Sequence, residues 1–275
     1  MAIIRSLIAA IYIGIQVESN WTKKWLYAIY LLLFAFSSTL AVIIIYGFLG
    51  GGFHTDKFLF ALFGALFYYL LSGVFFNTAF SVIDDREHYR TLKYIVISKT
   101  SYFVYSLGRA FGYAILQLIS IFLMLIWAVP VFKIQLTINP FLLFISFVLS
   151  FIGSFGLALM FSGYYMLAIR SETSLMDVLF GGLFIVSGAL FPPTVLPRFA
   201  FIFAKYFPLA SSIELMRYSF FGRNLSPFLA ELSISQLIAH VAFVNVASFA
   251  VGLFLFWLAM RSAIRKGYLD ITTAF

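Results

Sequence analysis

Long apolar stretches separated by short polar breaks make up most of the chain. A helix needs about 20 apolar residues to cross a bilayer. Six stretches reach or approach that length: residues 26–49, 58–83, 107–129, 141–169, 175–191 and 238–260. The fourth is longer than a bilayer requires, so we expect it to tilt or to project into the cytosol. The pattern predicts an all-α membrane protein with six transmembrane helices in a single domain, residues 1–275.

Small residues interrupt the fourth apolar stretch at regular intervals. Ser146, Ser150 and Ser154 recur every four residues, with Gly153 and Gly156 beside them. Small side chains at this spacing let two helices approach closely. We interpret them as packing contacts. A polar break, Asn139-Pro140, is expected to begin this helix.

Basic residues predict how the spans are oriented. An even number of spans places both termini on one side. That side holds most of the 18 Lys and Arg residues, namely Arg5, Lys23, Lys24, Arg86, Arg90, Lys93, Lys99, Arg109, Arg170, Arg261, Arg265 and Lys266. The loops of the other side hold Lys57, Lys133, Arg198, Lys205, Arg217 and Arg223. Because cytoplasmic loops carry an excess of Lys and Arg, we expect a multi-pass protein of the cell (plasma) membrane with cytoplasmic N- and C-termini.

The composition agrees with a lipid environment and excludes several functions. Of the 275 residues, 63% are hydrophobic and 10% are charged, whereas about 25% of a typical soluble domain is charged. The chain has no cysteine, which excludes disulfides and thiolate metal sites. The formal net charge is +8, but the basic residues are spread over loop ends. We therefore expect no nucleic-acid binding.

The first 20 residues predict a helix that lies along the membrane surface. The apolar residues of one face recur at helical spacing: Ile4, Leu7, Ile8, Ile11, Tyr12 and Ile15. Arg5, Gln16, Glu18 and Ser19 are polar. Such an amphipathic helix lies in the headgroup plane. It would serve either as an anchor or as a lever beside a cytoplasmic partner.

The densest charge follows the second span directly, in the run Asp84-Asp85-Arg86-Glu87-His88-Tyr89-Arg90-Thr91-Leu92-Lys93. With the apolar residues 94–97 it predicts a short amphipathic helix parallel to the membrane, with pairs such as Glu87 and Arg90. Three interpretations are open: a solvated loop that sets topology, a docking helix for a soluble partner, or a metal site of Asp84, Asp85, Glu87 and His88. The acids lack the spacing of an aspartate-rich Mg²⁺ motif, so we expect no metal.

Prolines interrupt the chain after the fifth apolar stretch. Pro192 and Pro193 must end or break a helix, and residues 199–207 are apolar but far too short to span a bilayer. Two short helices that dip into the outer leaflet, hinge at Pro208 and return account for both facts. This predicts a re-entrant hairpin on the extracellular side over residues 192–222. Irregular backbone at membrane depth is tolerated only when it is buried or faces a watery cavity, so we expect the hinge near a pathway or against a second copy of the chain.

The charged segment resembles part of a known family. Asp85-Arg86-Glu87, Thr91-Leu92 and Ser98 are similar to the Glu-Arg-Glu…Gly-Thr-Leu-Glu…Ser-Pro stretch of type-2 ATP-binding cassette (ABC) exporter permeases, with Arg90 at the family's Gly, Lys93 at its acid and Lys99 at its Pro. The resemblance implies that residues 84–104 form a coupling helix loop. Its ATPase-coupling residues would be Asp85, Arg86, Glu87, His88, Arg90, Thr91, Leu92 and Lys93. Charge reversal at Arg86 and Glu87 is then expected to break the complex with an ATPase.

The proline-marked segment resembles the same family more specifically. The run from Ser187 to Pro193, then Leu196-Pro197, Pro208-Leu209 and Arg217 are similar to its Gly…Pro…Leu-Pro…Pro-Leu…Arg signature. The resemblance extends over essentially the whole chain and implies that spans one, two and five line a substrate pathway. The candidate pathway or gate residues are Ser72, Asn77, Gly188, Pro192, Pro193, Pro197, Pro208, Glu214 and Arg217. Glu214 and Arg217 share one helical face, and either pair with each other or contact substrate headgroups.

The resemblance implies a transport subunit and no catalytic activity on this chain. The sequence has no Gly-x-x-x-x-Gly-Lys-Ser/Thr loop for ATP, so ATP and Mg²⁺ would belong to a separate cytosolic ATPase subunit, with no cofactor on this chain. One chain would form half of the pathway, paired with a second copy or a homologous permease.

Two other classes of function are weighed against this one. An integral-membrane transferase acting on lipid substrates is the alternative, and it would need a second acidic cluster at the membrane face. No acid, Lys or Arg lies in the middle of a predicted span, which counts against a proton- or sodium-coupled carrier.

Overall fold

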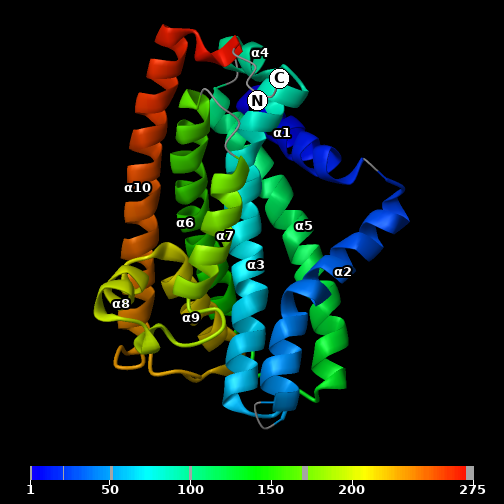
Figure 1. The fold of residues 1–275 in the computed structure, drawn as a ribbon, viewed down its shortest axis with the longest axis vertical. Coiled ribbons are helices and arrows are strands. Elements are labelled where there is room, and N and C mark those ends of the chain that lie inside the picture. Colours follow the sequence, from blue (N-terminus) through cyan, green and yellow to red (C-terminus); the bar gives the residue numbers. More distant parts are fainter. Residues whose placement is uncertain (1, 21, 50–51, 99–100, 169–172, 271–275) are drawn as a thin grey trace.

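The computed structural model describes residues 2–20, 22–49, 52–98, 101–168 and 173–270, and every regular element in these residues is a helix. The long helices are α2 (Lys24–Val42, continued by a π-helical segment Ile43–Leu49), α3 (Asp56–Ile83), α5 (Tyr102–Val131), α6 (Pro140–Leu167) and α10 (Ile234–Lys266). The shorter ones are α1 (Ala2–Ser19), α4 (Leu92–Ile97), α7 (Thr173–Val186), α8 (Arg198–Lys205) and α9 (Pro208–Phe221). The long helices form a bundle with α4 at one end and α8 and α9 at the other (Figure 1). The beginning of α1 and the end of α10 lie at the α4 end (Figure 1).

Side-chain caps begin most of the long helices. The hydroxyl groups of Thr55 and Ser101 accept hydrogen bonds from the first turns of α3 and α5. Asn139 caps α6 with Pro140 at its first position, as the sequence predicts. Ser233 forms a reciprocal capping box with Gln236 at the start of α10. These caps give hydrogen-bond partners to backbone amide groups that would otherwise lack them. An unpaired amide group costs more free energy in lipid than in water.

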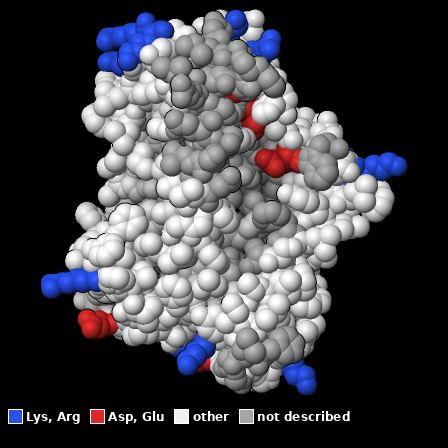
Figure 2. All heavy atoms as spheres, viewed as in Figure 1, with Lys and Arg blue, Asp and Glu red and all other residues white. Residues whose placement is uncertain are grey.

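Helix α3 lies at the centre of the bundle, whereas α10 lies at its edge. In the most apolar 18-residue window of α3, 94% of the window is buried, whereas in that of α10 only 28% is buried. Figure 2 shows that the acidic and basic side chains of one face gather mainly toward the two ends, with a broad region of uncharged atoms between them. An apolar outer surface of this kind suits lipid rather than water.

The structure matches the predicted number of six spans only in part. Among the described residues, α3 (with its extension to His88), α5, α6 and α10 are long and apolar enough to cross a membrane. Helices α8 and α9 make a bent pair with an angle of 68°, which would count as a fifth span or as a re-entrant loop. The predicted span at residues 175–191 is wrong in extent, because α7 has 14 residues and ends at Val186. Five residues then separate the end of α7 from Pro192, so the prolines do not end this helix.

The predicted close packing of the fourth span is confirmed at its glycines. A Cβ atom on Gly153 would collide with the Asn245 side chain, and one on Gly252 with the backbone oxygen of Gly156. Helices α6 and α10 therefore cross with their backbones in contact. This is the arrangement that small residues allow in membrane helices.

Replacing Gly252 by Ala should push α6 and α10 apart. We expect the variant to lose about 1–3 kcal/mol of stability, the usual cost of overpacking, seen as a lower thermal unfolding midpoint in detergent. The control is Gly182→Ala in α7, where a new Cβ meets nothing within 4 Å. That change should be neutral or stabilising by about 0.5–1 kcal/mol, because Ala loses less backbone entropy than Gly. Equal midpoints for the two variants would contradict the close crossing.

Candidate functional site

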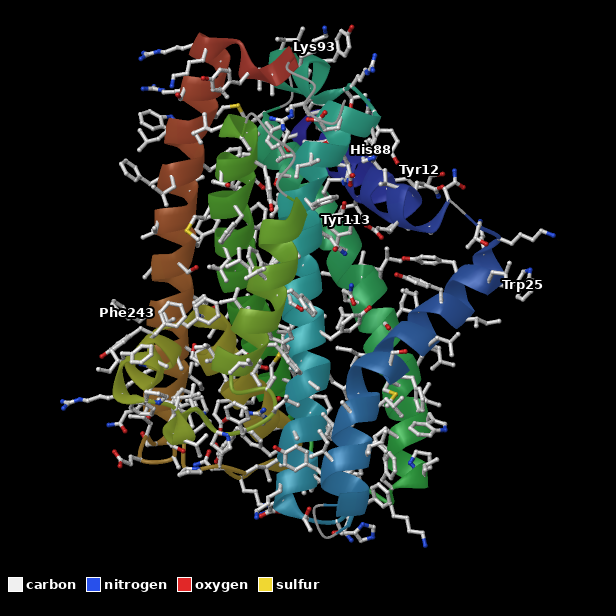
Figure 3. All side chains as sticks on the ribbon, viewed as in Figure 1. Tyr12, Trp25, His88, Lys93, Tyr113 and Phe243 are labelled. Atoms are coloured by element: carbon white, nitrogen blue, oxygen red, sulfur yellow. The ribbon has the colours of Figure 1, made fainter. Side chains whose placement is uncertain are left out.

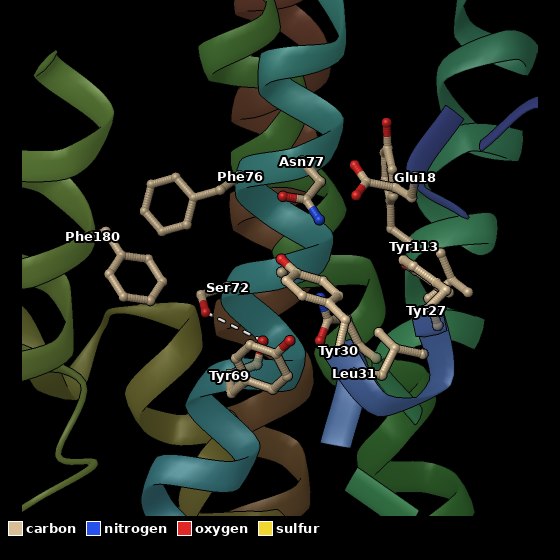
Figure 4. A pocket seen from close by; sticks show the side chains of 13 residues that line it. Glu18, Tyr27, Tyr30, Leu31, Tyr69, Ser72, Phe76, Asn77, Tyr113 and Phe180 are labelled. Carbon is tan, nitrogen blue, oxygen red and sulfur yellow. Dashed lines mark hydrogen bonds between the residues drawn. The ribbon is translucent and has the colours of Figure 1, made fainter. Parts of the chain in front are cut away.

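A cavity of about 190 Å³ lies beside α3, halfway along the bundle. Five helices line it: α1 with Glu18, α2 with Tyr27 and Tyr30, α5 with Tyr113 and Gln117, α7 with Phe180, and α3 with Tyr69, Ser72, Phe76 and Asn77. Figure 4 shows the aromatic rings of Tyr27, Tyr30, Tyr69, Phe76 and Phe180 around the space, with Glu18 and Asn77 on one side. The cavity is therefore aromatic with a few polar groups, which is the usual make-up of a ligand pocket.

Two of the predicted pathway residues, Ser72 and Asn77, line this cavity. The Ser72 hydroxyl donates to the Tyr69 backbone oxygen at 3.3 Å, one turn earlier in α3. The carboxyl of Glu18 lies at the C-terminal end of α1, where burial raises its pKa above the ordinary value, while the nearby Arg109 opposes that shift. Sequence patterns did not indicate the tyrosines or Gln117, because aromatic residues are common throughout the chain.

The charged segment continues α3 directly. Asp84–His88 is π-helical and begins where α3 ends, so the cavity and the charged segment lie on one continuous helix. The single amphipathic helix expected over residues 84–97 is wrong. The chain turns at Tyr89–Thr91 and begins again as α4, with the side chain of Leu92 buried. His88 and Lys93 lie at the same end of the molecule (Figure 3).

The turn before α4 explains a departure from the family pattern. Arg90 has a φ of 52°, in the left-handed region that favours glycine. It occupies the place where the resemblance has Gly, and here an arginine adopts the conformation that glycine adopts most readily. Tyr89 and Tyr94 are more than half exposed beside it, and Ile97 is 75% exposed. Residues 99–100 of this predicted loop, including Lys99, lie outside the described residues.

Asp85 and Arg86 are buried, which the sequence did not indicate. Arg109 Nη1 lies 3.2 Å from Asp85 Oδ1 and donates to Tyr105 Oη at 2.8 Å, while Arg109 Nε donates to Tyr113 Oη at 3.1 Å. The assignment of Arg109 to a cytoplasmic loop is wrong, because it lies inside α5 and is fully buried. The Tyr113 ring lines the cavity, so this ion pair connects the charged segment to the cavity wall.

Arg86 holds the end of α6. Its Nη1 donates to the backbone oxygens of Tyr165 at 3.1 Å and Ala168 at 2.9 Å, where α6 lacks intrahelical partners. Arg86 Nε lies 2.9 Å from Glu87 Oε1, a pair that the sequence did not predict. His88 pairs with Asp84 at 3.3 Å, and the Thr91 hydroxyl donates to the Asp85 oxygen at 3.4 Å. No group of three or more His, Asp or Glu that could hold a metal occurs in the described residues.

The remaining predicted pathway residues lie at the opposite end, around a buried ion pair. Arg217 Nη1 lies 3.0 Å from Glu214 Oε2, so these two residues pair with each other. Gly188, with a φ of 69°, and Ala189 offer their backbone oxygens to Arg217. Pro192, Pro193 and Pro197 form the turns before α8, and Pro208 begins α9. None of these residues lines the cavity, so the structure separates the predicted pathway residues into two groups.

A family model described as ABC-2 type transporter matches residues 2–221. The chain belongs to the ABC-2 type transporter family. It is accordingly the membrane-spanning permease subunit of an ABC transporter, a multi-pass transport protein and not itself an enzyme. This removes the lipid transferase as an alternative. A search of curated proteins finds no match.

Proposed function

We propose that this ABC-2 permease is the membrane subunit of an ATP-driven exporter, in which it forms half of the substrate pathway and couples to a separate cytosolic ATPase. The observation that carries the proposal is the continuity of α3. The helix bears Tyr69, Ser72 and Asn77 on the cavity and runs on into the segment Asp84–His88. A force applied to that segment would therefore move the cavity wall directly.

The membrane arrangement follows from the same layout. We propose six spans, in which α2 and α7 join the four long apolar helices and α8–α9 form a re-entrant hairpin on the extracellular side. Both termini and α4 then lie in the cytoplasm, since the beginning of α1 and the end of α10 lie at the α4 end (Figure 1). Helix α1 would lie at the membrane surface. Its Ile4, Ile8 and Tyr12 are exposed, whereas Ala10 is buried; Figure 3 labels Tyr12 on this helix.

The partners follow from what one chain lacks. The cavity lies to one side of α3 in a single bundle, so a second copy of this chain or a homologous permease would complete the pathway. ATP and Mg²⁺ would bind to the cytosolic ATPase subunits. Their closure on ATP would push both coupling segments and open the cavity to the outside, a rigid-body transition of a known kind.

The exposed residues of the coupling segment provide the test. Arg86 is unsuitable for charge reversal, because it is buried and holds the end of α6. Arg90→Glu with Tyr94→Ala alters only exposed groups beside α4. We expect at least about tenfold less ATPase to copurify with this double variant, because interface anchors are commonly worth 2 kcal/mol or more.

The matched control is Arg198→Glu with Phe199→Ala, an exposed arginine and aromatic at the opposite end of the molecule. This control should recover as much ATPase as the wild type, measured by pull-down from the membrane fraction. Full recovery with the Arg90/Tyr94 variant, or equal loss in both variants, would refute docking at the coupling segment.

A further inference from the structure

The described residues that line the cavity include one acidic side chain and no basic one. Among the described residues that line it, Glu18 alone carries a charge, and its other polar groups are hydroxyls and the amides of Asn77 and Gln117. Arg109, whose charge acts on Glu18, lies 3.2 Å from Asp85 and donates to two tyrosine hydroxyls. Its charge is thus already matched by a carboxylate outside the cavity. A ligand that entered would meet one acidic side chain, Glu18, and no basic side chain among these described lining residues.

The aromatic rings of the cavity act in the same direction. Tyr27 and Tyr30 stack with their ring centroids 5.8 Å apart, and the ring of Tyr69 faces the same space (Figure 4). The face of an aromatic ring attracts cations, and several rings around one space form the cage that recognises quaternary ammonium groups. A carboxylate beside such rings strengthens the preference for positive charge, because opposite charges attract more strongly near a protein surface than in bulk water.

We infer that the cavity selects organic cations, and that its Glu18 carboxylate and tyrosine rings hold the cationic head of the transported substrate. The inference rests on the proposed function, in which this cavity is part of the export pathway. The volume of about 190 Å³ is below the 300–1,000 Å³ of a typical pocket for a drug-sized ligand. It suits a compact ammonium head, while an apolar body would extend toward the second permease.

Binding of charge-matched probes to the purified full chain tests the inference directly. The probes are benzyltrimethylammonium, its uncharged isostere neopentylbenzene, and the anion benzenesulfonate, in dodecyl maltoside, whose head group carries no charge. We expect the cation to bind roughly tenfold more tightly than the neutral isostere, since a partly desolvated cation–π contact is worth about that factor. The anion should not compete. Equal affinity for the cation and its neutral isostere, or competition by the anion, would overturn the inference without any variant.

Substitutions at two cavity residues, each with a control, test whether the preference for a cation comes from this cavity. Glu18→Gln keeps the size of the side chain but removes its coulombic attraction for the cation, so it should weaken binding roughly tenfold, whereas the exposed control Glu231→Gln should not. Tyr30→Leu should weaken binding, and Tyr30→Phe, which keeps the ring, should preserve it. Unchanged affinity in Glu18→Gln with an unchanged thermal midpoint would refute the role of Glu18.

These measurements need neither ATP nor the ATPase. Their failure would leave the exporter proposal intact, to be judged by copurification of the ATPase. Conversely, loss of that proposal would not alter the measured preference for a cation.

Discussion

Replacing Arg217 by Leu is expected to destabilise the protein by about 3–5 kcal/mol, the usual cost of breaking a buried ion pair. Arg217 is 2% exposed and lies 3.0 Å from Glu214. Its Nε donates to the Phe60 oxygen at 3.0 Å and its Nη2 to the oxygens of Gly188 and Ala189 at 2.7 and 3.2 Å. Without Arg217, a buried carboxylate and three carbonyl groups lose their donor. Thermal unfolding of the purified variant measures the loss.

A matched exposed pair on the same chain provides the control. Arg223 lies 2.6 Å from Asp56, but both side chains are about half exposed. Arg223→Leu should therefore cost no more than about 1 kcal/mol. Adding Glu214→Gln to Arg217→Leu should restore part of the lost stability, because the uncompensated charge is removed. If Arg217→Leu proved as mild as Arg223→Leu, Arg217 would not hold α9 to α3 and the turn after α7 in the way described.

Replacing Arg109 by Leu is expected to have the second largest effect, again about 3–5 kcal/mol. The side chain is fully buried, and it joins Asp85, at the base of the coupling segment, to Tyr105 and Tyr113 of α5. Its removal leaves the buried Asp85 carboxylate without its cationic partner. Arg109→Lys should lie between wild type and Leu, because lysine keeps the charge but lacks the planar fork that reaches several acceptors.

The comparison with Asp85 separates charge from packing. Asp85→Asn in the Arg109→Leu background should recover part of the loss, measured as a coupling energy in a double-mutant cycle. The control is Arg261→Leu, which removes an exposed arginine stacked 3.6 Å from the Trp257 ring at the end of α10. That variant should change stability by less than about 1 kcal/mol. Strict additivity of the Asp85 and Arg109 effects would show that the two residues do not interact.

Some helix boundaries are predicted from the sequence, where a local signal marks them. Asn139 and Pro140 mark the beginning of α6, and Pro208 marks the hinge between α8 and α9. The small residues of α6 mark its crossing with α10. Each signal acts within a few residues, through a missing amide donor, a side-chain cap or a missing Cβ atom.

The candidate site was predictable only in part. Ser72 and Asn77 were expected on a pathway, and both line the cavity. The sequence did not single out the tyrosines that surround them. A helix that is apolar on every side shows no amphipathic pattern, so its sequence does not reveal which face meets a cavity. Asp85, Arg86 and Arg109 were misplaced for a related reason, since charge in a sequence predicts exposure unless its partner is known.

The sequence by itself determined that the chain is a helical membrane protein and that Pro140 and Pro208 mark helix starts, because these properties depend on local composition and spacing. Only the tertiary structure decided that Arg109 pairs with Asp85, that Arg86 caps α6, that Arg217 holds the hairpin, and that Glu18 meets a ring of tyrosines. These contacts join residues far apart in the chain, and most come from helices of similar apolar character. Which helical faces meet is set by the packing of the whole bundle.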